Sequence, residues 1–311
     1  MESIIQFQNV TRRFGKTVAL NDFSLEVPRG VVCALLGANG AGKTTAIQVL
    51  LGLDRPQQGR SLVMGMESHR FSREIRQRIG YVADQPALYD WMTVEEIGWF
   101  TSGFYPWGFA DEYSKNIQRL GLDPQKRIRD LSREMMSKVS LSLAISHQPD
   151  LLVMDEPTSG LDPLVRREFL ESMVDMAGAG STVFLSSHQV PEVERVADIV
   201  VILLDGRVAH TAYLDDLKSS VHEVVVTLPN PGAPHPQPRG DVLAQLAIGH
   251  EQLWMVRNFE PGPFVDACRN QGLPEPQIRQ PHLEDILLAM LREYRKPVQN
   301  SNASETPLAS R

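Results

Sequence analysis

Cysteine is scarce in this sequence, and long apolar runs are missing from it. The 311 residues include two cysteines, Cys33 and Cys268, whose positions suit neither a zinc site nor a disulfide framework and fit a reducing cytosol. No apolar run approaches the roughly 18 residues that a membrane-spanning helix needs. The first residues lack the basic and apolar regions of a secretory signal. We therefore expect a chain that does not cross a bilayer by itself.

An excess of basic charge is also missing. The chain has 31 Lys and Arg against 38 Asp and Glu, a formal net charge of -7 and a pI near 5.7. No basic field is available to hold a phosphate backbone by counterion release, so nucleic acid is not expected as the main partner. What is present is ordinary globular composition, 42% hydrophobic and 22% charged. This composition excludes disorder of the whole chain, and the length suits one large domain with an appendage or two modest domains.

The apolar pattern of the first part predicts strands followed by a strand, loop and helix unit. Apolar residues alternate along residues 3–27, with turn residues between the runs, which indicates an antiparallel start. Residues 31–36 are apolar at consecutive positions, as expected for a strand covered on both faces. A glycine-rich turn and a helical pattern at 44–51 follow.

Later apolar runs predict that this strand joins a mostly parallel sheet. The runs 151–154 and 182–185 end in polar residues and alternate with helical patterns at 163–176 and 191–197. Residues 199–208 are typical of a strand and hairpin that close the sheet. Between the strands, helical spacing at 93–104, 111–120 and 137–145 predicts a helical subdomain over about residues 90–148.

The composition changes after residue 218, which we take as the end of the first domain. Five prolines fall within residues 229–238, which excludes a regular element and predicts a long loop or linker. Strand patterns at 221–228 and 253–258 and helical patterns at 264–271 and 283–294 predict a small α+β region over 219–296. Residues 297–311 are polar and predict a disordered tail.

A glycine-rich motif lies between the apolar run 31–36 and the helical pattern that follows it. It matches the phosphate-binding P-loop and occupies the position that the mechanism of this loop requires. Its backbone N–H groups would surround the β-phosphate at the positive end of a helix, Lys43 would direct charge to the β and γ oxygens, and Thr44 would offer a hydroxyl to Mg²⁺. The alternative is a plain glycine-rich turn at a helix start. The predicted nucleotide-binding residues are Gly37, Ala38, Asn39, Gly40, Ala41, Gly42, Lys43, Thr44 and Thr45.

Two carboxylates, Asp155 and Glu156, end the apolar run 151–154. They therefore emerge at the carboxyl edge of a sheet strand, where ligands bind in open α/β folds. Asp155 would hold Mg²⁺ through water. Glu156 would polarise the attacking water, because γ-phosphoryl transfer needs positioning, charge neutralisation and a base near the nucleophile. A loop after a strand often carries acids without a site, and the upstream P-loop favours the catalytic interpretation.

Together these motifs resemble the nucleotide-binding subunit of ABC transporters over residues 1–218. Their order and separation are more specific than any single motif. The resemblance implies an α/β fold: a P-loop ATPase core with a mostly parallel sheet, an antiparallel β subdomain and a helical subdomain, followed here by the small α+β region. Besides the P-loop, the segments that carry it are Leu151-Leu152-Val153-Met154-Asp155-Glu156-Pro157-Thr158-Ser159-Gly160-Leu161-Asp162-Pro163 and Ser186-Ser187-His188.

The resemblance implies a head-to-tail dimer that sandwiches two ATP molecules. In it, the loop 159–162 with Asp162 would cross the dimer seam, His188 would contact the γ-phosphate, and Phe14 aligns with the aromatic residue that stacks on adenine. By its own chemistry a histidine after a strand is more typical of a structural hydrogen bond, and a phenylalanine at position 14 is more typical of the core.

Two segments depart from the family pattern. Family members usually carry Gln after Gly-Tyr-Val-Pro, whereas this chain has Asp84 followed by Gln85. Asp84 would reach Mg²⁺ through its oxygens, or Gln85 would serve with a shift of one residue, and both interpretations stay open. The signature Leu-Ser-Gly-Gly-Gln reads Leu131-Ser132-Arg133-Glu134-Met135. Ser132 is kept, but Glu134 stands where a glycine would approach the opposite γ-phosphate, or it merely favours the start of a helix.

We therefore predict an ATP-hydrolysing subunit with ATP and Mg²⁺ as cofactors, at the cytoplasmic face of the membrane. It would pair with a second ATP-binding subunit and drive a separate membrane-spanning subunit. Residues 89–94 and 283–287 resemble family members that serve exporters of drugs, antibiotics or lipids. Leu88, Tyr89 and Trp91 would be docking anchors for the membrane subunit, or the aromatic ones would be simple core residues.

Two alternatives stay open. One is a soluble ABC ATPase that acts on translation or DNA, which the absence of heptads between the P-loop and the Asp-Glu pair disfavours. The other is a binding module in which Glu134 has abolished turnover and ATP only regulates assembly.

Overall fold

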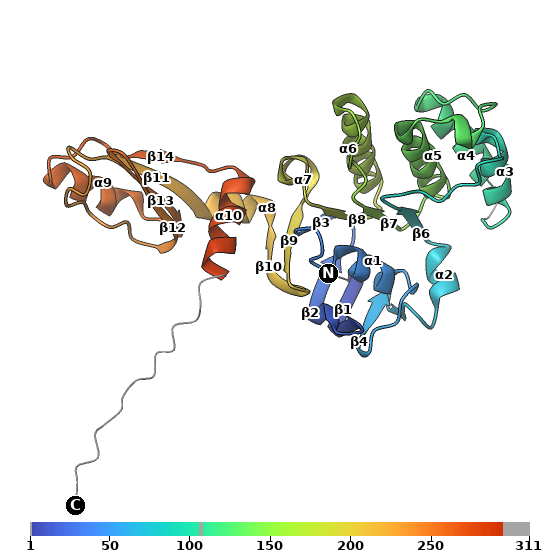
Figure 1. The fold of residues 1–311 in the computed structure, drawn as a ribbon, viewed down its shortest axis with the longest axis horizontal. Helices are drawn as coiled ribbons and strands as arrows, with labels where there is room; N and C mark the ends of the chain where they lie inside the picture. Colours follow the sequence, from blue (N-terminus) through green and yellow to red (C-terminus); the bar gives the residue numbers. More distant parts are fainter. Residues whose placement is uncertain (1, 106–107, 295–311) are drawn as a thin grey trace, which may run out of the picture. The chain divides into compact units, whose positions relative to one another are not determined.

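The computed structural model describes residues 2–105 and 108–294. The chain divides into two compact units, Met1–Asp215 and Asp216–Arg311, and each is described by itself (Figure 1). The sequence analysis placed the boundary at residue 218. The predicted tail at 297–311 lies outside the described residues.

The first unit contains two sheets and the helices that connect their strands. Its strands are β1 (Ser3–Phe14), β2 (Thr17–Pro28), β3 (Val32–Leu36), β4 (Gln58–Val63), β5 (Met66–Glu67), β6 (Ile79–Val82), β7 (Leu151–Asp155), β8 (Thr182–Ser187), β9 (Ile199–Leu204) and β10 (Arg207–Tyr213). Its helices are α1 (Lys43–Leu50), α2 (Ser72–Arg76), α3 (Val94–Ser102), α4 (Phe109–Arg119), the short 3-10 helix η1 (Ile128–Asp130), α5 (Arg133–Ile145), α6 (Pro163–Gly178) and α7 (Val190–Val196). Helix α8 (Leu214–Ser220) runs across the boundary between the units.

A six-stranded sheet with the order β10-β9-β3-β8-β7-β6 forms the centre of this unit. All neighbours pair in parallel except β10, which pairs antiparallel with β9, so the predicted mostly parallel sheet and closing hairpin are confirmed. Every residue of β3 is buried, as its unbroken apolar run predicted, and every residue of β7 and β8 is buried as well. In the register of the sheet Leu36 pairs with Ser187, and Asp155 pairs with Ser186. The segments that follow these strands therefore meet at one edge.

The second sheet of this unit is antiparallel, with the order β2-β1-β4-β5. Residues 3–27 form two long strands rather than several short ones, and the rings of Phe7 and Phe23 meet edge to face at 4.8 Å in the buried core. The sequence analysis missed β4 and β5. The first three residues of β4, Gln-Gly-Arg, are exposed and none has an apolar side chain, so they show no alternation to detect.

Three helices, α3, α4 and α5, confirm the helical patterns between β6 and β7 (Figure 1). Helix α3 begins with a capping box, in which Thr93 and Glu96 exchange side chain to backbone hydrogen bonds. Helix α5 begins at Arg133, four residues before the predicted pattern, because the Ser132 hydroxyl accepts a hydrogen bond from the Met135 N–H at 3.2 Å.

The second unit is built on an antiparallel sheet with the order β12-β13-β11-β14. Its strands are β11 (Val221–Thr227), β12 (Asp241–Ile248), β13 (Glu251–Arg257) and β14 (Gln277–Arg279), and its helices are α9 (Pro261–Asn270) and α10 (Leu283–Tyr294). Trp254 and Phe264 lie at its core with their rings 5.8 Å apart. The sequence analysis missed β12, in which most residues are exposed and apolar residues do not alternate with polar ones.

No helix in residues 2–105 and 108–294 is long and apolar enough to cross a membrane.

Candidate functional site

Two glycines of the P-loop are required by the backbone around them. The loop, residues 37–42, joins the buried strand β3 to α1. Gly42 has a φ of 110°, and a Cβ on it would lie 2.3 Å from the Ala19 carbonyl oxygen. A Cβ on Gly37 would lie 2.9 Å from the Leu203 carbonyl oxygen. The loop therefore follows a path that side chains at these two positions would obstruct.

Lys43 is the buried cation of the site, with a relative exposure of 6%. Its Nζ donates to the carbonyl oxygens of Gly37 at 2.6 Å and Ala38 at 3.3 Å. The same atom lies 3.0 Å from Glu156 Oε1. The predicted P-loop lysine and the predicted base are therefore in direct contact, although 112 residues separate them in the sequence.

Glu156 is held on both carboxylate oxygens and on its backbone. Oε1 pairs with Lys43, and Oε2 lies 2.7 Å from His188 Nδ1 and accepts the His188 backbone N–H at 3.3 Å. Its φ is 48°, a left-handed conformation that costs a residue with a Cβ roughly 1 kcal/mol. Such backbone strain persists where the surrounding structure over-determines it, often at functional sites.

Ser186 joins the two acids, a role that the sequence analysis did not predict. Its Oγ donates to Asp155 Oδ1 at 2.6 Å and accepts the Glu156 N–H at 3.0 Å. Asp155 itself is buried, with 3% exposure. Burial, together with the charges of Asp155 and Asp84, raises the pKa of Tyr81 to about 12. The polar end of the apolar run 182–185 was the available signal for Ser186.

The remaining P-loop residues form the accessible side of the site. Ala38, Asn39, Gly40 and Thr44 are exposed, Thr45 is half-buried and Ala41 is buried. Thr44 and Asp155 are oxygen donors of the kind that Mg²⁺ prefers, and Mg²⁺ is usually held by one or two side chains together with phosphates. No cluster of three or more His, Cys, Asp or Glu side chains in the described part of the chain forms a metal cage of its own. The residues fit Mg²⁺ carried with a nucleotide.

The start of α5 is one of the two segments that depart from the family pattern, and it contacts the other at Asp84. Arg133 Nη2 lies 3.7 Å from Asp84 Oδ1, and both side chains are about half exposed. Glu134 lies in the first turn of α5, where its Oε1 accepts the backbone N–H of Asp162 at 3.4 Å. Gln85 is exposed. Glu134 therefore has the position that the helix-start interpretation requires.

Asp162 caps α6, because its Oδ1 accepts the N–H groups of Val165 at 3.0 Å and Leu164 at 2.8 Å. The hydrogen bond from Val165 is the main cause that lowers the pKa of this carboxyl. Capping alone accounts for an acid at this position, whatever its role in a dimer.

Phe14 lies at the end of β1, in the antiparallel sheet, and is 47% exposed. The interpretation as a core residue is therefore wrong. The guanidinium of Arg12 lies 4.3 Å from the centre of its ring. The structure does not bring Phe14 into the group of Lys43, Glu156 and His188.

A second network that the sequence did not reveal supports the loop after Glu156. Glu192 is buried and accepts a hydrogen bond from Thr158 Oγ1, and Arg166 Nε lies 3.0 Å from its other oxygen. In the sequence Glu192 reads as an ordinary acid in the first turn of a short helix. No local signal distinguished it.

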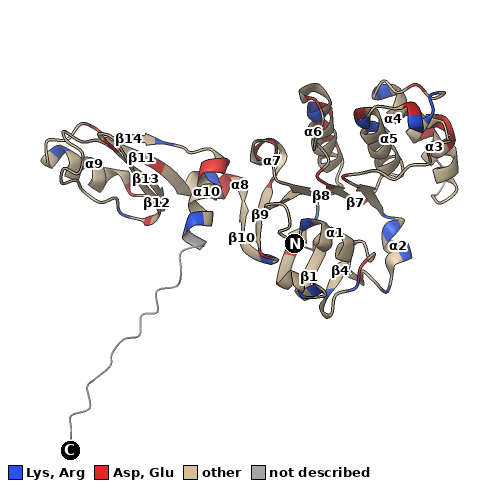
Figure 2. Ribbon diagram, in the orientation of Figure 1, with Lys and Arg blue, Asp and Glu red and all other residues tan. Residues whose placement is uncertain are grey.

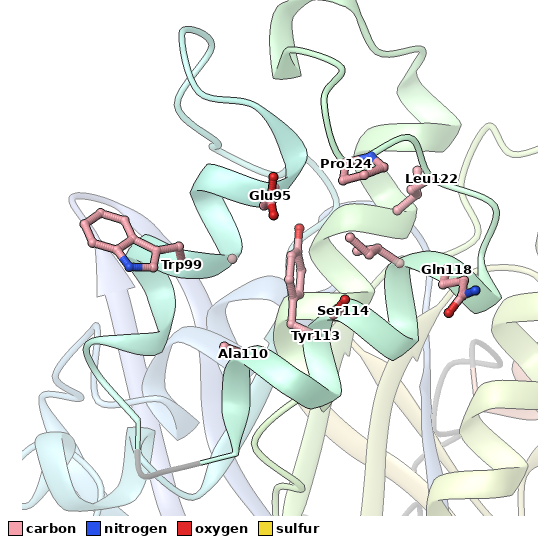
Figure 3. Close-up of a pocket in the computed structure, with 10 residues that line it drawn as sticks. Glu95, Trp99, Ala110, Tyr113, Ser114, Gln118, Leu122 and Pro124 are labelled. Atoms are coloured by element: carbon pink, nitrogen blue, oxygen red, sulfur yellow. The ribbon is translucent and has the colours of Figure 1, made fainter.

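A separate pocket of about 430 Å³ lies between α3 and α4 (Figure 3). Gly98 leaves room for the ring of Tyr113, since a Cβ there would lie 2.1 Å from that ring. Tyr113 donates to the Val94 carbonyl oxygen at 2.7 Å. Trp99, at the mouth of the pocket, is 75% exposed. None of the predicted site residues lines this pocket.

Comparisons with known proteins agree with this site. A family model described as ABC transporter matches residues 20–159. The Nod factor export ATP-binding protein I of Cupriavidus metallidurans is 31% identical over 306 residues, which cover 95% of this chain and 100% of the relative. The relative named "Probable multidrug ABC transporter ATP-binding protein YbhF", of Escherichia coli, is 35% identical over 223 residues, 70% of this chain and 38% of the relative. The chain thus spans well under two thirds of that relative's length.

A solved structure of an ATP-binding subunit of an ABC transporter has the same fold, with a TM-score of 0.65 and 29% identity. The match covers 70% of this chain and 92% of the solved chain. The family match, the fold and the geometry of the site all support the same family assignment. The chain belongs to the family of ABC transporter ATP-binding subunits.

Proposed function

We propose that this chain binds ATP with Mg²⁺ and hydrolyses it. The observation that carries the proposal is the buried contact of Lys43 with Glu156, whose other carboxylate oxygen contacts His188. The contact places a cation for phosphate oxygens beside a base for water. The alternative is an ion pair that only stabilises the fold. Such a pair would require neither a P-loop before the lysine nor a glutamate with a strained backbone.

In this proposal each residue has a defined task. The loop N–H groups and Lys43 bind the β- and γ-phosphates, and Glu156 accepts the proton of the attacking water. His188 holds the carboxylate of Glu156 and contacts the γ-phosphate. Mg²⁺, held by Thr44 and Asp155, would neutralise phosphate charge when bound.

The family resemblance supports further contacts for residues outside this group. Phe14 would stack on adenine, and either Asp84 or Gln85 would reach the metal. Ser132 and Asp162 would serve at the seam of a dimer.

Lys43→Ala tests the proposal at its first step. Removing the cation leaves the phosphate oxygens with loop N–H groups alone, and hydrogen bonds to charged groups are worth about 1.5 to 3 kcal/mol each, so we expect a loss of ATP affinity of at least about tenfold. Titration with a fluorescent nucleotide measures the affinity. Lys115→Ala, which removes a surface lysine paired with Glu112, is the matched control. An affinity unchanged by Lys43→Ala would contradict the P-loop assignment.

We further propose two partners: a separate membrane-spanning subunit and a second ATP-binding subunit, identical or different. The chain would then act at the cytoplasmic face of the membrane. The similarity to proteins named for multidrug transport and Nod factor export supports export of a drug, antibiotic or lipid-like substrate.

A strip of four aromatic side chains is the surface that we propose for the membrane subunit. Tyr89 contacts Trp91 and Phe100, and Phe100 contacts Phe104, with ring centres 5.5 to 6.0 Å apart. Their exposed fractions are 51% for Tyr89, 64% for Trp91, 37% for Phe100 and 63% for Phe104. The alternative that Tyr89 and Trp91 are core residues is therefore wrong. Exposed apolar patches of this kind mark interaction sites.

The strip ends at a hollow of about 840 Å³ that also contains arginines of α2. Arg73 and Arg76 line it together with Phe104 and Tyr105. Within the described residues, no carboxylate lies within 4.0 Å of either arginine. Figure 2 shows α2 in the blue that marks Lys and Arg. This combination suits a segment of the membrane subunit that carries an apolar face and an acidic residue at one end.

Crosslinking from Asp90→Cys tests this surface in the co-expressed complex. We expect an adduct with the membrane subunit, and Arg73→Glu with Arg76→Glu should reduce it while ATP binding stays unchanged. Arg167→Glu, on the exposed surface of α6, is the control for charge reversal. Absence of an adduct under conditions that label other sites would count against the strip.

One observation favours a second candidate function. Arg133 and Glu134 occupy the signature positions where the family pattern has two glycines, so ATP would regulate assembly with little turnover. ATPase assays with and without the membrane subunit separate this regulatory module from an engine.

A further inference from the structure

Strand β12 of the second unit is an open edge of its sheet. It pairs with β13 on one side, and no other described strand pairs with it (Figure 1). A bulge interrupts the pairing between Val242 and Ala244, and the register is regular from Ala244 to Ile248. An edge strand presents a row of backbone N–H and C=O groups that another strand can bind.

Beyond the bulge, residues 244–248 lack the charged residues, prolines and glycines that protect many edge strands, although helix α10 packs against β12. Residues 242–248 read Val-Leu-Ala-Gln-Leu-Ala-Ile, without a charge, a proline or a glycine. Residues 245–248 are all exposed, with Leu246 at 46% and Ile248 at 56%. The opposite edge of the sheet shows the contrast. Strand β14 has three residues, and its Arg279 is exposed.

Three apolar residues of β12, the exposed Leu246 and Ile248 and the half-buried Ala244, share one face of the sheet, and the exposed Ala247 lies on the other. Ala244, Leu246 and Ile248 are opposite Met255, Leu253 and Glu251 of β13. Gln245 is opposite Trp254 and therefore lies on the other face. Leu246 thus stands at the centre of a short apolar row, with Ala244 and Ile248 at its ends.

We propose that β12 pairs antiparallel with β12 of a second copy of this chain, with a two-fold axis at Leu246. In this register Leu246 lies beside its own counterpart, and Ala244 lies beside Ile248 of the other copy. The face alternation is preserved, because both residues of each pair belong to the same face. A two-fold axis brings identical residues together, so a charged residue near it would repel its counterpart. The uncharged run 242–248 meets this requirement.

This pairing is independent of ATP. It uses neither the P-loop nor any residue of the site, so it would hold two copies together whether or not nucleotide is bound. Failure of the pairing would leave the proposed ATPase function untouched, and loss of ATP binding would leave the pairing untouched.

Disulfide crosslinking of the full chain tests the register. Both native cysteines have 0% exposure and give little background. Directly opposite residues of antiparallel strands lie about 4.5 to 5.5 Å apart, within the reach of a disulfide. We expect Leu246→Cys to form dimers under mild oxidation without nucleotide. A mixture of Ala244→Cys with Ile248→Cys should also form them. Each of these two alone should give about tenfold less, because four residues of strand separate the thiols by about 13 Å.

Two controls complete the experiment. Gln277→Cys places a thiol at an exposed position of β14 and should stay monomeric. Leu246→Lys places two charges at the axis and should abolish the nucleotide-independent dimer measured by light scattering. Val174→Lys, on α6 and 51% exposed, should not.

Three outcomes would overturn the proposal. A purified chain that is monomeric without nucleotide and gives no Leu246→Cys dimer shows that a second copy does not occupy this edge. If Gln277→Cys, Ala244→Cys alone and Ile248→Cys alone crosslink as efficiently as Leu246→Cys, the copies touch without a defined strand register. A dimer that survives Leu246→Lys lies elsewhere on the molecule.

Discussion

The carboxyl edge of the central sheet and the start of α5 hold their charged groups in different ways. At the sheet edge Lys43 and Glu156 have side-chain exposures of 6% and 14% and lie 3.0 Å apart. At the start of α5, Arg133 and Asp84 have exposures of 53% and 41% and lie 3.7 Å apart. The first region keeps the motif pattern of the family, and the second departs from it.

The difference in burial shows which of the two charged pairs contributes more to the organisation of the site. A buried, short contact that is fixed by loop and strand backbones is organised before a ligand arrives. Exposed ion pairs contribute about 0 to 1 kcal/mol each, because solvent screens them and the side chains lose rotamer freedom. The segments that depart from the family pattern therefore lie in a region where each ion pair contributes little free energy to the geometry.

Glu156→Gln is the change that should break this comparison most strongly. The amide preserves the shape but cannot accept a proton, so we expect turnover to fall about 100- to 10,000-fold with nucleotide affinity retained. Phosphate release and nucleotide titration measure the two quantities, and Glu171→Gln on the surface of α6 is the control. Hydrolysis at the wild-type rate would show that Glu156 is not the base, and Asp84 or His188 would be tested next.

Acid titration tests the other end of α5, where His147 follows the helix. Burial lowers the pKa of His147 from 6.5 to about 4, and its ring stacks on Tyr105 at 4.2 Å. A depressed pKa means that stability is fully present above about pH 6.5 and is lost as the pH falls toward 4, by roughly 2 to 3 kcal/mol.

Urea unfolding at several pH values measures this loss, and His147→Phe should flatten the curve between pH 6.5 and 4. An equal slope in both proteins would assign the acid sensitivity to other groups.

Glu134→Gly sharpens the comparison at the signature segment. If the carboxylate faces an opposite nucleotide, its removal relieves like-charge repulsion, and we expect higher basal ATPase activity and stronger ATP-dependent dimerisation. The glycine itself costs roughly 1 kcal/mol of stability near a helix start, so Glu134→Gln, which removes only the charge, is the control. Lower thermal stability with an unaltered ATPase rate in both variants would refute the repulsion.

The pair of Asp84 and Arg133 should give the smallest effect. A double-mutant cycle of Asp84→Ala and Arg133→Ala should report a coupling free energy below about 1 kcal/mol, since both side chains are half exposed. Chemical denaturation of the four proteins provides the values. A coupling above about 2 kcal/mol would mean that the start of α5 is held as firmly as the sheet edge.

The sequence by itself determined the central sheet and the residues at its edge. The buried strands β3, β7 and β8 contain apolar runs, the P-loop follows β3 directly, and the two acids end and follow β7. Their position was predictable because parallel strands end at one edge, so residues far apart in the chain are brought together by topology alone. The strands β4 and β12 could not be predicted because much of each is exposed, so neither needs the alternation of apolar and polar residues that marks a half-buried strand.

Only the tertiary structure decided which groups touch. The contact of Lys43 with Glu156, the bridge of Ser186 between two acids and the support of Thr158 by Glu192 depend on strand register and on rotamers. The sequence pattern contains no information on strand register or on rotamers. The exposure of Phe14 and Tyr89 was decided in the same way, since an aromatic residue reads alike in a core and on a surface. Whether such a residue is buried depends on all the elements that pack around it, whereas the spacing of residues in the sequence describes only one element at a time.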